Sequence, residues 1–278
     1  QVEWVVPAAL PNAIGRNASA VNAAGFLGPA LAGIRVARVG EAGCFGINAA
    51  SFSIVIVTLI FLRLPFPATL DRRGSLGGSV LAGVTYLRGQ PDLLRMIGIL
   101  SLCSLVFAPY VVVPVFARDV LHVDATGLGL LMAAVGVGAV VGGLLAAGYQ
   151  GTRRLAWLIG ASLVFGLGQI AFALSSAFAL SALLLAVGGA AFVVSQSLTN
   201  SLLQLHTPGE LRGRVLSFYA LLSIGSGRLG GLPIGAGARV WSAPLALAVG
   251  AALCLLGICA LSPPMLLSRS NRDGQGSR

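Results

Sequence analysis

Long uncharged apolar runs are the feature that most limits how this chain can fold. The run over residues 126–149, for example, contains no charged side chain. A membrane-spanning helix needs about 20 mostly apolar residues, whereas a strand of a membrane barrel needs roughly 10 of alternating polarity. Both structures satisfy their own backbone hydrogen bonds, but only helices match runs of this length. The predicted fold class is therefore an all-α integral membrane bundle.

The composition supports this prediction. Of the 278 residues, 56% are hydrophobic and 9% are charged, and the mean hydropathy is +0.92. Such a chain has too little polar surface to cover a soluble globule. All 18 basic residues are arginines, placed singly or in pairs at the ends of apolar runs. This placement indicates an anionic lipid leaflet as partner and excludes a nucleic-acid groove, in which basic and aromatic residues would be interleaved.

Eight spans are expected, and a polar break divides them unevenly. The break carries five arginines between Arg63 and Arg95. Within it, Leu76, Val80, Val84 and Leu87 recur at helical spacing, which predicts an amphipathic helix lying on the membrane surface. Two spans precede the break and six follow it, at about residues 13–33, 42–62, 93–117, 126–149, 155–175, 177–200, 215–240 and 243–261.

The predicted organisation has four parts. Residues 1–62 hold two membrane helices, residues 63–92 form a cytoplasmic linker with the surface helix, residues 93–262 form a six-helix bundle and residues 263–278 form a disordered tail. Arginines at one set of helix ends outnumber those at the other by thirteen to four. By the positive-inside rule, this bias places the linker and the C-terminus in the cytoplasm.

No constellation of residues indicates catalysis, a metal or a cofactor. Cys44, Cys103, Cys254 and Cys259 all lie inside apolar runs, where a cysteine is most simply a small packing residue. The two histidines fall in loops on opposite faces of the membrane. No predicted span contains aspartate or glutamate. A proton-binding carboxylate within the membrane is therefore expected only in helices outside this chain, or is absent.

Several polar or flexible positions inside the spans are candidates for function. Arg228 falls within the span 215–240 and is expected either to face an aqueous pathway, where it would attract an anionic cargo group, or to lie near a helix end. Gln196 and Asn200 either line a cavity or bond neighbouring helices.

Gly25, Gly28, Pro29 and Gly33 lie in the first span. They predict a bent, closely packed helix that serves as a gate or as an ordinary packing face.

Three segments resemble the major facilitator superfamily, particularly its branch of enterobactin exporters and macrolide efflux proteins. LPNAIGRNASAVNAAGFLGPALAG, residues 10–33, resembles the fifth helix of these exporters. Its Gly28, Pro29 and Gly33 match the antiporter signature G-x-x-x-G-P-x-x-G-G, although Ala24 and Ala32 replace two of its glycines. Residues 127–148 resemble the eighth helix.

The third segment, NSLLQLHTPGELRGRVLSFY over residues 200–219, resembles the loop between helices ten and eleven, including Glu210, Arg212 and Arg214. Thr207, Pro208 and Glu210 there also predict a capping box with proline at the first helical position.

The resemblance implies that the chain corresponds to helices five to twelve of a twelve-helix transporter and lacks the first four. It implies a bacterial inner-membrane exporter of a small amphiphilic molecule, such as a drug or siderophore, working by proton antiport and rocking of two bundles. The missing helices or another chain would then complete the pathway. The alternative is a truncated remnant or scaffold that does not transport. A membrane enzyme is disfavoured because the sequence shows no metal-ligand cluster, no nucleophile with a base nearby and no pair of carboxylates in the membrane.

Overall fold

The computed structural model describes Gly46 and Gly83 and residues 49–58, 60–61, 85–107, 109–149, 151 and 153–275. The chain divides into two compact units, Gln1–Gly78 and Ser79–Arg278. In the first unit an apolar helix covers Ala49–Thr58, inside the second predicted span. The first predicted span and most of the predicted surface helix lie outside the described residues.

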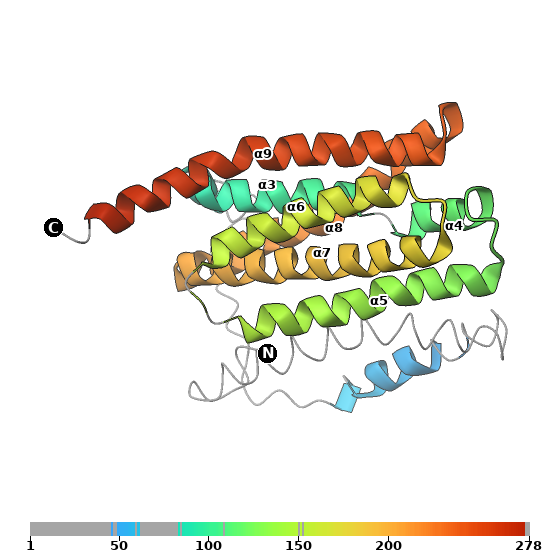
Figure 1. Ribbon diagram of the computed structural model, residues 1–278. Helices are drawn as coiled ribbons and strands as arrows, with labels where there is room; N and C mark the ends of the chain where they lie inside the picture. Colours follow the sequence, from blue (N-terminus) through green and yellow to red (C-terminus); the bar gives the residue numbers. More distant parts are fainter. Residues whose placement is uncertain are drawn as a thin grey trace. The chain divides into compact units, whose positions relative to one another are not determined.

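The second unit is a bundle of helices (Figure 1), and its described residues form no strand. Five of its helices are long and apolar enough to cross a membrane, so this is a multi-pass membrane protein. The helices are α3 (Pro91–Val106), α4 (Pro109–Asp119), α5 (Ala125–Gly148), α6 (Arg154–Ala173), α7 (Phe178–His206), α8 (Gly209–Val240) and α9 (Ala243–Gln275).

The expectation of one continuous helix over residues 93–117 is wrong, because two helices cover this segment. Helix α3 ends at Val106, and the amide of Phe107 donates to the carbonyl oxygen of Cys103 over 2.8 Å. Helix α4 then begins at Pro109. A proline lacks the backbone N–H and disfavours helical geometry in the residue before it. The break therefore follows from Pro109, which the apolar pattern alone does not reveal.

The last helix also differs from expectation. Helix α9 continues to Gln275, whereas the sequence predicts a disordered tail from residue 263. Pro263 and Pro264 lie in the interior of α9, and each lacks the backbone N–H that would donate to the preceding turn. The physical effect of the two prolines is thus loss of hydrogen bonds within α9 and not its termination.

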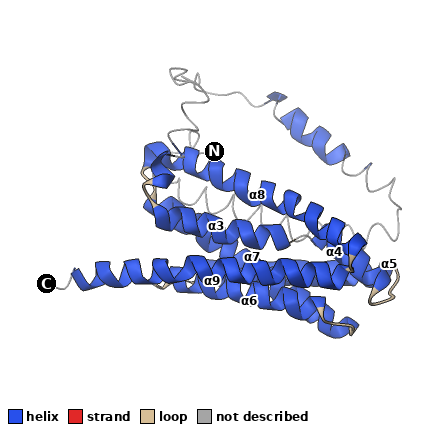
Figure 2. Ribbon diagram, turned by 90° about the horizontal axis from the view of Figure 1, so that it is seen from above, coloured by secondary structure: helices blue, strands red, loops and turns tan. Residues whose placement is uncertain are grey.

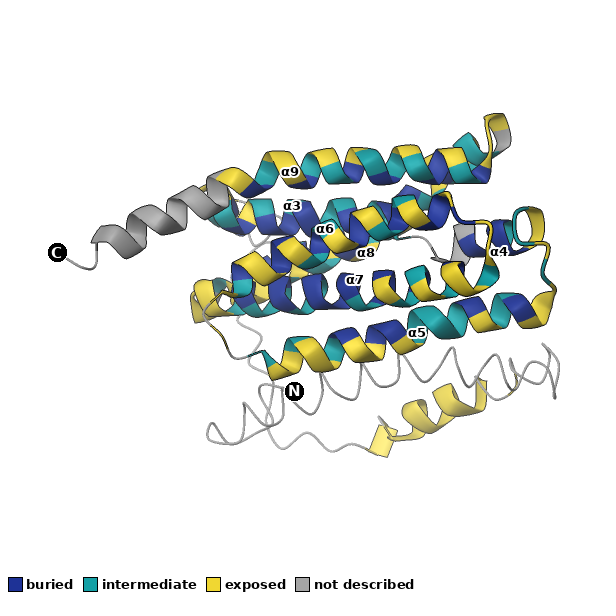
Figure 3. Ribbon diagram, viewed as in Figure 1, coloured by how far each residue is buried: buried dark blue, intermediate teal, exposed yellow. Residues whose placement is uncertain are grey.

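The helices run alongside one another in both views of the bundle (Figures 1 and 2). Helix α7 packs on α5 and on α6, while α9 packs on α6, α3 and α8, and α8 also packs on α3. Buried residues follow α7 along much of its length, whereas the outer side of α5 is exposed (Figure 3). Helix α7 is accordingly the central element of one half of the bundle.

Aromatic side chains fill the core between these helices. The rings of Phe107 and Phe192 stack with their centroids 4.1 Å apart, and Phe165 lies 5.9 Å and 5.7 Å from them. A second stacked pair, Phe116 and Phe172, has a centroid distance of 4.6 Å. These contacts tie the break between α3 and α4 to α6 and α7, so the interrupted span is held on both sides of its interruption.

Glycines bring helices α5 and α7 into backbone contact. A Cβ atom on Gly138 would lie 1.8 Å from the carbonyl oxygen of Ala186, and one on Gly142 would lie 2.2 Å from that of Ala190. Real Cβ atoms do not come so close, so only glycine fits at either position. Gly138 and Gly142 form a G-x-x-x-G pair, and such pairs allow close packing of membrane helices.

Helix α8 carries a G-x-x-x-G pattern at Gly227, Gly231 and Gly235. Its closest approach to α3, however, is at Gly230, which lies outside this pattern. A Cβ on Gly230 would lie 1.9 Å from the carbonyl oxygen of Leu105, whereas one on Gly227 would be 3.4 Å from that of Ser104. Gly235 has open space around it. The glycine repeat thus identifies small residues but not the side of the helix that meets a neighbour among the described helices.

Candidate functional site

The described bundle contains two polar regions that bear on transport: the face of α7 that carries Gln196 and Asn200, and the exposed side of α8 that carries Arg228. The predicted gate residues Gly25, Gly28, Pro29 and Gly33 lie outside the described residues.

The hydroxyl groups of α7 are used inside the bundle. The hydroxyl oxygens of Ser195 and Ser162, on α7 and α6, lie 2.8 Å apart, and both residues are fully buried. The hydroxyl of Thr199 donates to the carbonyl oxygen of Ser195 over 2.8 Å. A buried hydroxyl without a partner is costly in a membrane, so this set of bonds joins α6 to α7.

Gln196 and Asn200 are half-buried and lie next to helix α8. The hydroxyl of Tyr219 on α8 donates to the backbone carbonyl of Gln196 over 3.4 Å, and the side-chain amide of Gln204 donates to the Asn200 side-chain oxygen. Asn200 is thus partly satisfied within its own helix. The backbone of Gln196 thus helps to hold α8 against α7.

Arg228 lies on the exposed side of α8, inside the span Leu211–Ala238. Leu221, Ile224 and Leu232 share this side and are 67%, 63% and 70% exposed. The opposite side of the helix, with Val215, Tyr219 and Ile234, is buried. The arginine therefore interrupts an apolar surface near the middle of a membrane span.

The structure does not bring Arg228 together with Gln196 and Asn200. Tyr219, which contacts Gln196, precedes Arg228 by nine residues on the same helix. Nine residues correspond to about 14 Å along the axis and half a turn around it. The three candidate pathway residues therefore do not form one site within the described bundle.

A helix begins after the connection between α7 and α8, as predicted, but its N-terminus is not capped by the predicted residues. Helix α8 starts at Gly209, and Pro208 occupies the N-cap with no side-chain hydrogen bond. The Thr207 hydroxyl is buried and has no hydrogen-bond partner among the described residues. The predicted capping box is therefore wrong: the fixed backbone of Pro208 supplies the N-cap, which places Thr207 one residue too early to bond the first turn.

The start of α8 is also the place where the linker meets the bundle. A Cβ on Gly83 would lie 3.2 Å from the Cβ of Arg214, and the hydroxyl of Tyr86 donates to the carbonyl oxygen of His206 over 3.0 Å. Leu87, one residue further on, is 1% exposed. Glu210 lies in the first turn of α8, and Arg212 and Arg214 have exposed side chains. The C-terminal part of the linker, which contains Gly83 and Tyr86, is thus fixed to the α7–α8 connection.

Reasoning from sequence overlooked three of these polar contacts. Ser162 and Tyr86 are single polar residues next to or within an apolar run and belong to no motif, and Tyr219 is the last residue of the segment 200–219, whose resemblance does not indicate a partner for the hydroxyl. A hydroxyl group inside a membrane span needs a hydrogen-bond partner, and this rule alone could have indicated such contacts. It identifies the residue that needs a partner but not the helix that supplies the partner. In the described part of the chain, no group of three or more metal-ligating side chains comes together.

Comparison with known proteins agrees with this architecture. The model of the transmembrane secretion effector family matches residues 2–275. The enterobactin exporter of Escherichia coli O81 (strain ED1a) is 29% identical over 248 residues, which cover 84% of this chain and 56% of that protein. The enterobactin exporter of Citrobacter koseri is 30% identical over 219 residues, or 74% of this chain and 50% of that protein. The chain spans about half the length of these relatives.

The resemblance noted in the sequence is therefore confirmed by the match along almost the whole chain and by the helical bundle that the same residues form. The chain belongs to the transmembrane secretion effector family of the major facilitator superfamily.

Proposed function

We propose that this chain is the larger part of an exporter that moves a small amphiphilic molecule, such as a siderophore or drug, across the bacterial inner membrane. The observation that carries this proposal is the family match over residues 2–275, together with relatives that are named as enterobactin exporters. Export would proceed by rocking of two bundles around a central site, with protons moving in the opposite direction. The C-terminus and the linker would face the cytoplasm.

The second unit supplies one of the two bundles in this proposal. Its core is held by glycine contacts between α5 and α7 and by buried hydroxyl pairs between α6 and α7. Such a body moves as a unit because its interfaces are closely packed. The linker, which is attached to the α7–α8 connection through Tyr86 and Gly83, would transmit motion between the bundles. Gly25, Gly28, Pro29 and Gly33 would bend the helix of the other bundle that acts as a gate.

Arg228 is the residue that we assign to the cargo pathway. An arginine facing lipid at mid-membrane costs about 2.5–3.5 kcal/mol on insertion scales. That cost is avoided when the side chain faces water or an anionic group. The exposed position of Arg228 on α8 supports this role, and its charge favours cargo that carries a negative charge. Gln196 and Asn200 would contribute polar contacts from α7 at a different depth in the membrane.

Efflux measurements test the proposed function. The 278-residue chain, and the same reading frame extended upstream to the length of the relatives, are expressed in bacteria that lack their own siderophore exporter. We expect the extended protein to lower the accumulation of a catecholate siderophore or of ethidium, and a protonophore to abolish the effect. A protein that is present in the membrane but leaves accumulation unchanged would instead support the non-transporting scaffold. A reporter fused to the C-terminus checks the orientation.

A further inference from the structure

Two cysteines from different helices meet in the core of the bundle. Cys103 on α3 and Cys254 on α9 are 0% and 2% exposed, and neither forms a disulfide. The thiol of Cys103 interacts with the thiol of Cys254 and with the hydroxyl of Ser162 on α6. The two cysteines are here called the thiol pair. Neither thiol has a role in the proposed transport.

Close contacts between helices fix the backbone next to the thiol pair. Helix α9 packs on both α3 and α6 (Figure 1). A Cβ on Gly257 of α9 would lie 2.5 Å from the side chain of Leu102, and one on Gly166 of α6 would lie 2.6 Å from that of Leu255. Leu102 and Leu255 are the sequence neighbours of the two cysteines. The glycines therefore let the three helices pack closely at the depth of the thiol pair.

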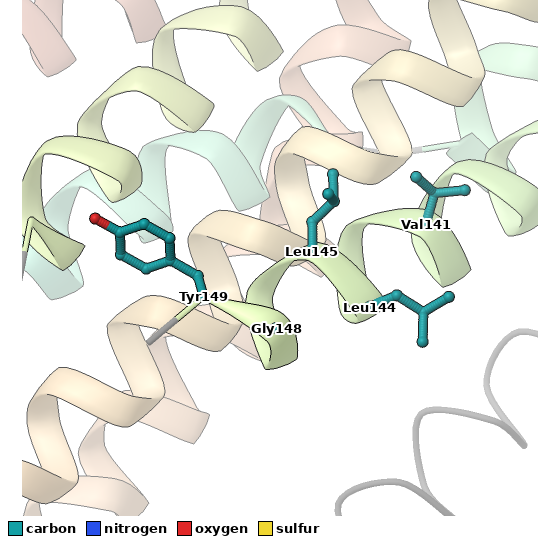
Figure 4. Close-up of a pocket in the computed structure, with 5 residues that line it drawn as sticks. All are labelled: Val141, Leu144, Leu145, Gly148 and Tyr149. Carbon is teal, nitrogen blue, oxygen red and sulfur yellow. The ribbon is translucent and has the colours of Figure 1, made fainter. Parts of the chain in front are cut away.

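This enclosure distinguishes the thiol pair from the groove on α5, which Figure 4 shows. The groove is lined by the end of one helix, with Val141, Leu144, Leu145, Gly148 and Tyr149. It offers a metal ion one phenol hydroxyl and no thiol, imidazole or carboxylate. The thiol pair instead supplies two sulfur ligands from two helices, in a place that solvent does not reach.

The number of ligands limits which metal ion fits the thiol pair. The Ser162 hydroxyl donates to the carbonyl oxygen of Leu158 and lies 2.8 Å from the hydroxyl oxygen of Ser195, so it is already bonded within the bundle. Among the described residues, no group of three or more metal-ligating side chains comes together. A zinc ion, which prefers four ligands in a tetrahedron, is therefore excluded. A soft ion that binds two thiolates in line is the class that fits.

Net charge decides which soft ion suits this core. Copper(I) or silver(I) with two thiolates carries one negative charge, which is costly in an apolar interior. Mercury(II) with two thiolates has no net charge. Leu100, Phe165 and Ile258, on the same three helices, are 0% exposed, so the interior here is apolar and favours the uncharged complex.

We propose that Cys103 and Cys254 form a two-coordinate site for mercury(II), and that the bound ion joins α3 to α9. Mercury(II) chloride is uncharged and reaches the site through the membrane. Each sulfur loses its proton and forms a bond to mercury, and two chloride ions and two protons leave. No atom is oxidised or reduced. Because the ion binds the folded bundle and links two helices that are far apart in sequence, it stabilises the bundle against unfolding.

Mercury loading of the purified chain tests the proposal. Cys44→Ser and Cys259→Ser together leave the thiol pair as the only cysteines. This variant is incubated with one equivalent of mercury(II) chloride and is then dialysed against glutathione, which removes mercury that a single thiolate holds. We expect intact-protein mass spectrometry to show one mercury per chain, thiol titration to find both sulfurs blocked, and the melting temperature to rise.

The matched control keeps two cysteines on the same two helices but separates them. Cys44→Ser combined with Cys254→Ser leaves Cys103 and the exposed Cys259. This control should retain mercury about a hundredfold more weakly against glutathione, because each sulfur then binds alone. Equal retention in the control would overturn the proposal. Two mercury ions per chain, mercury that joins two chains, or no mercury bound after loading close to the melting temperature would overturn it as well.

X-ray absorption by mercury keeps the proposal open to refutation if a serine variant does not fold. The unchanged chain is loaded with one equivalent of mercury(II) chloride, and the atoms bonded to mercury are identified. We expect two sulfur neighbours and no chloride. A chloride neighbour would mean that a single thiolate holds the ion, and three or more sulfur neighbours would mean a different set of cysteines. Either result would overturn the assignment to the thiol pair.

Discussion

Helices α7 and α8 use polar residues in opposite ways. On α7, Ser195 and Thr199 are fully buried and bond within the bundle. On α8, Arg228 stands on an exposed apolar side, half a turn from the buried residues of the same helix. A polar group inside a membrane bundle stabilises the fold, whereas a charge on its outer side needs water, lipid phosphate or cargo. The difference predicts which substitutions affect stability and which affect transport.

The largest effect is expected where α7 meets α5. In Gly138→Leu, the new side chain would collide with the backbone at Ala186, so the helices must separate. We expect the free energy of unfolding to fall by about 1–3 kcal/mol or more, as for other overpacked sites. Thermal denaturation in detergent measures this. Gly129→Ala, at a position with open space, is the control and should not destabilise the protein. If the Gly138→Leu variant were as stable as the unchanged protein, the close contact between Gly138 and the backbone at Ala186 would be contradicted.

Next in size is the effect of Arg228→Gln, which should change transport without changing stability. At a low concentration of cargo, we expect the rate of export of an anionic cargo to fall about tenfold, because one favourable charge interaction is lost. The rate for a neutral cargo should stay the same. Uptake into inverted vesicles of the extended protein measures both. If the two cargoes respond alike at unchanged expression, Arg228 does not select for charge.

A smaller effect is expected for the hydroxyl pair between α6 and α7. Ser162→Ala removes the partner of Ser195 and should lower stability by about 0.6 kcal/mol, a typical value for hydrogen bonds between membrane helices. Ser217→Ala on α8 is the matched control, because that hydroxyl is exposed and bonds only within its own helix. A loss of stability in the control as large as that in Ser162→Ala would remove the contrast between the helices.

The smallest effect belongs to an exposed ion pair outside the spans. The Arg118 guanidinium donates to Asp119 over 2.6 Å and holds the pKa of that carboxyl below its usual value. The pair therefore stabilises the fold above about pH 4, where an unfolded aspartate is ionised, and this contribution is lost as the pH falls through the folded pKa. Asp119→Asn should lower the melting temperature slightly at pH 7 and progressively less in acid. In an Arg118→Gln background it should have no effect.

Much of the fold could be predicted because membrane spans depend on local composition. The ranges expected for α5 and α6 differ from the structure by one or two residues, since their ends coincide with changes from apolar to polar sequence. The predicted span 177–200 is too short because α7 continues to His206. Leu202 and Leu203 in this extension are buried, but the polar residues beside them, such as Gln204 and His206, are typical of a loop. The break before Pro109 was missed because the residues on both sides of it are equally apolar.

The sequence by itself determined that the chain spans a membrane, where helices α5 and α6 begin and end, and which family it resembles, because apolar length and local motifs encode these properties. Only the tertiary structure decided which glycines touch a neighbouring backbone, that Ser195 and Ser162 bond each other, and that the side of α8 that carries Arg228 is exposed. These facts depend on how each helix is rotated about its axis. That rotation is set by packing against other helices, and a nearly uniform apolar sequence does not specify it.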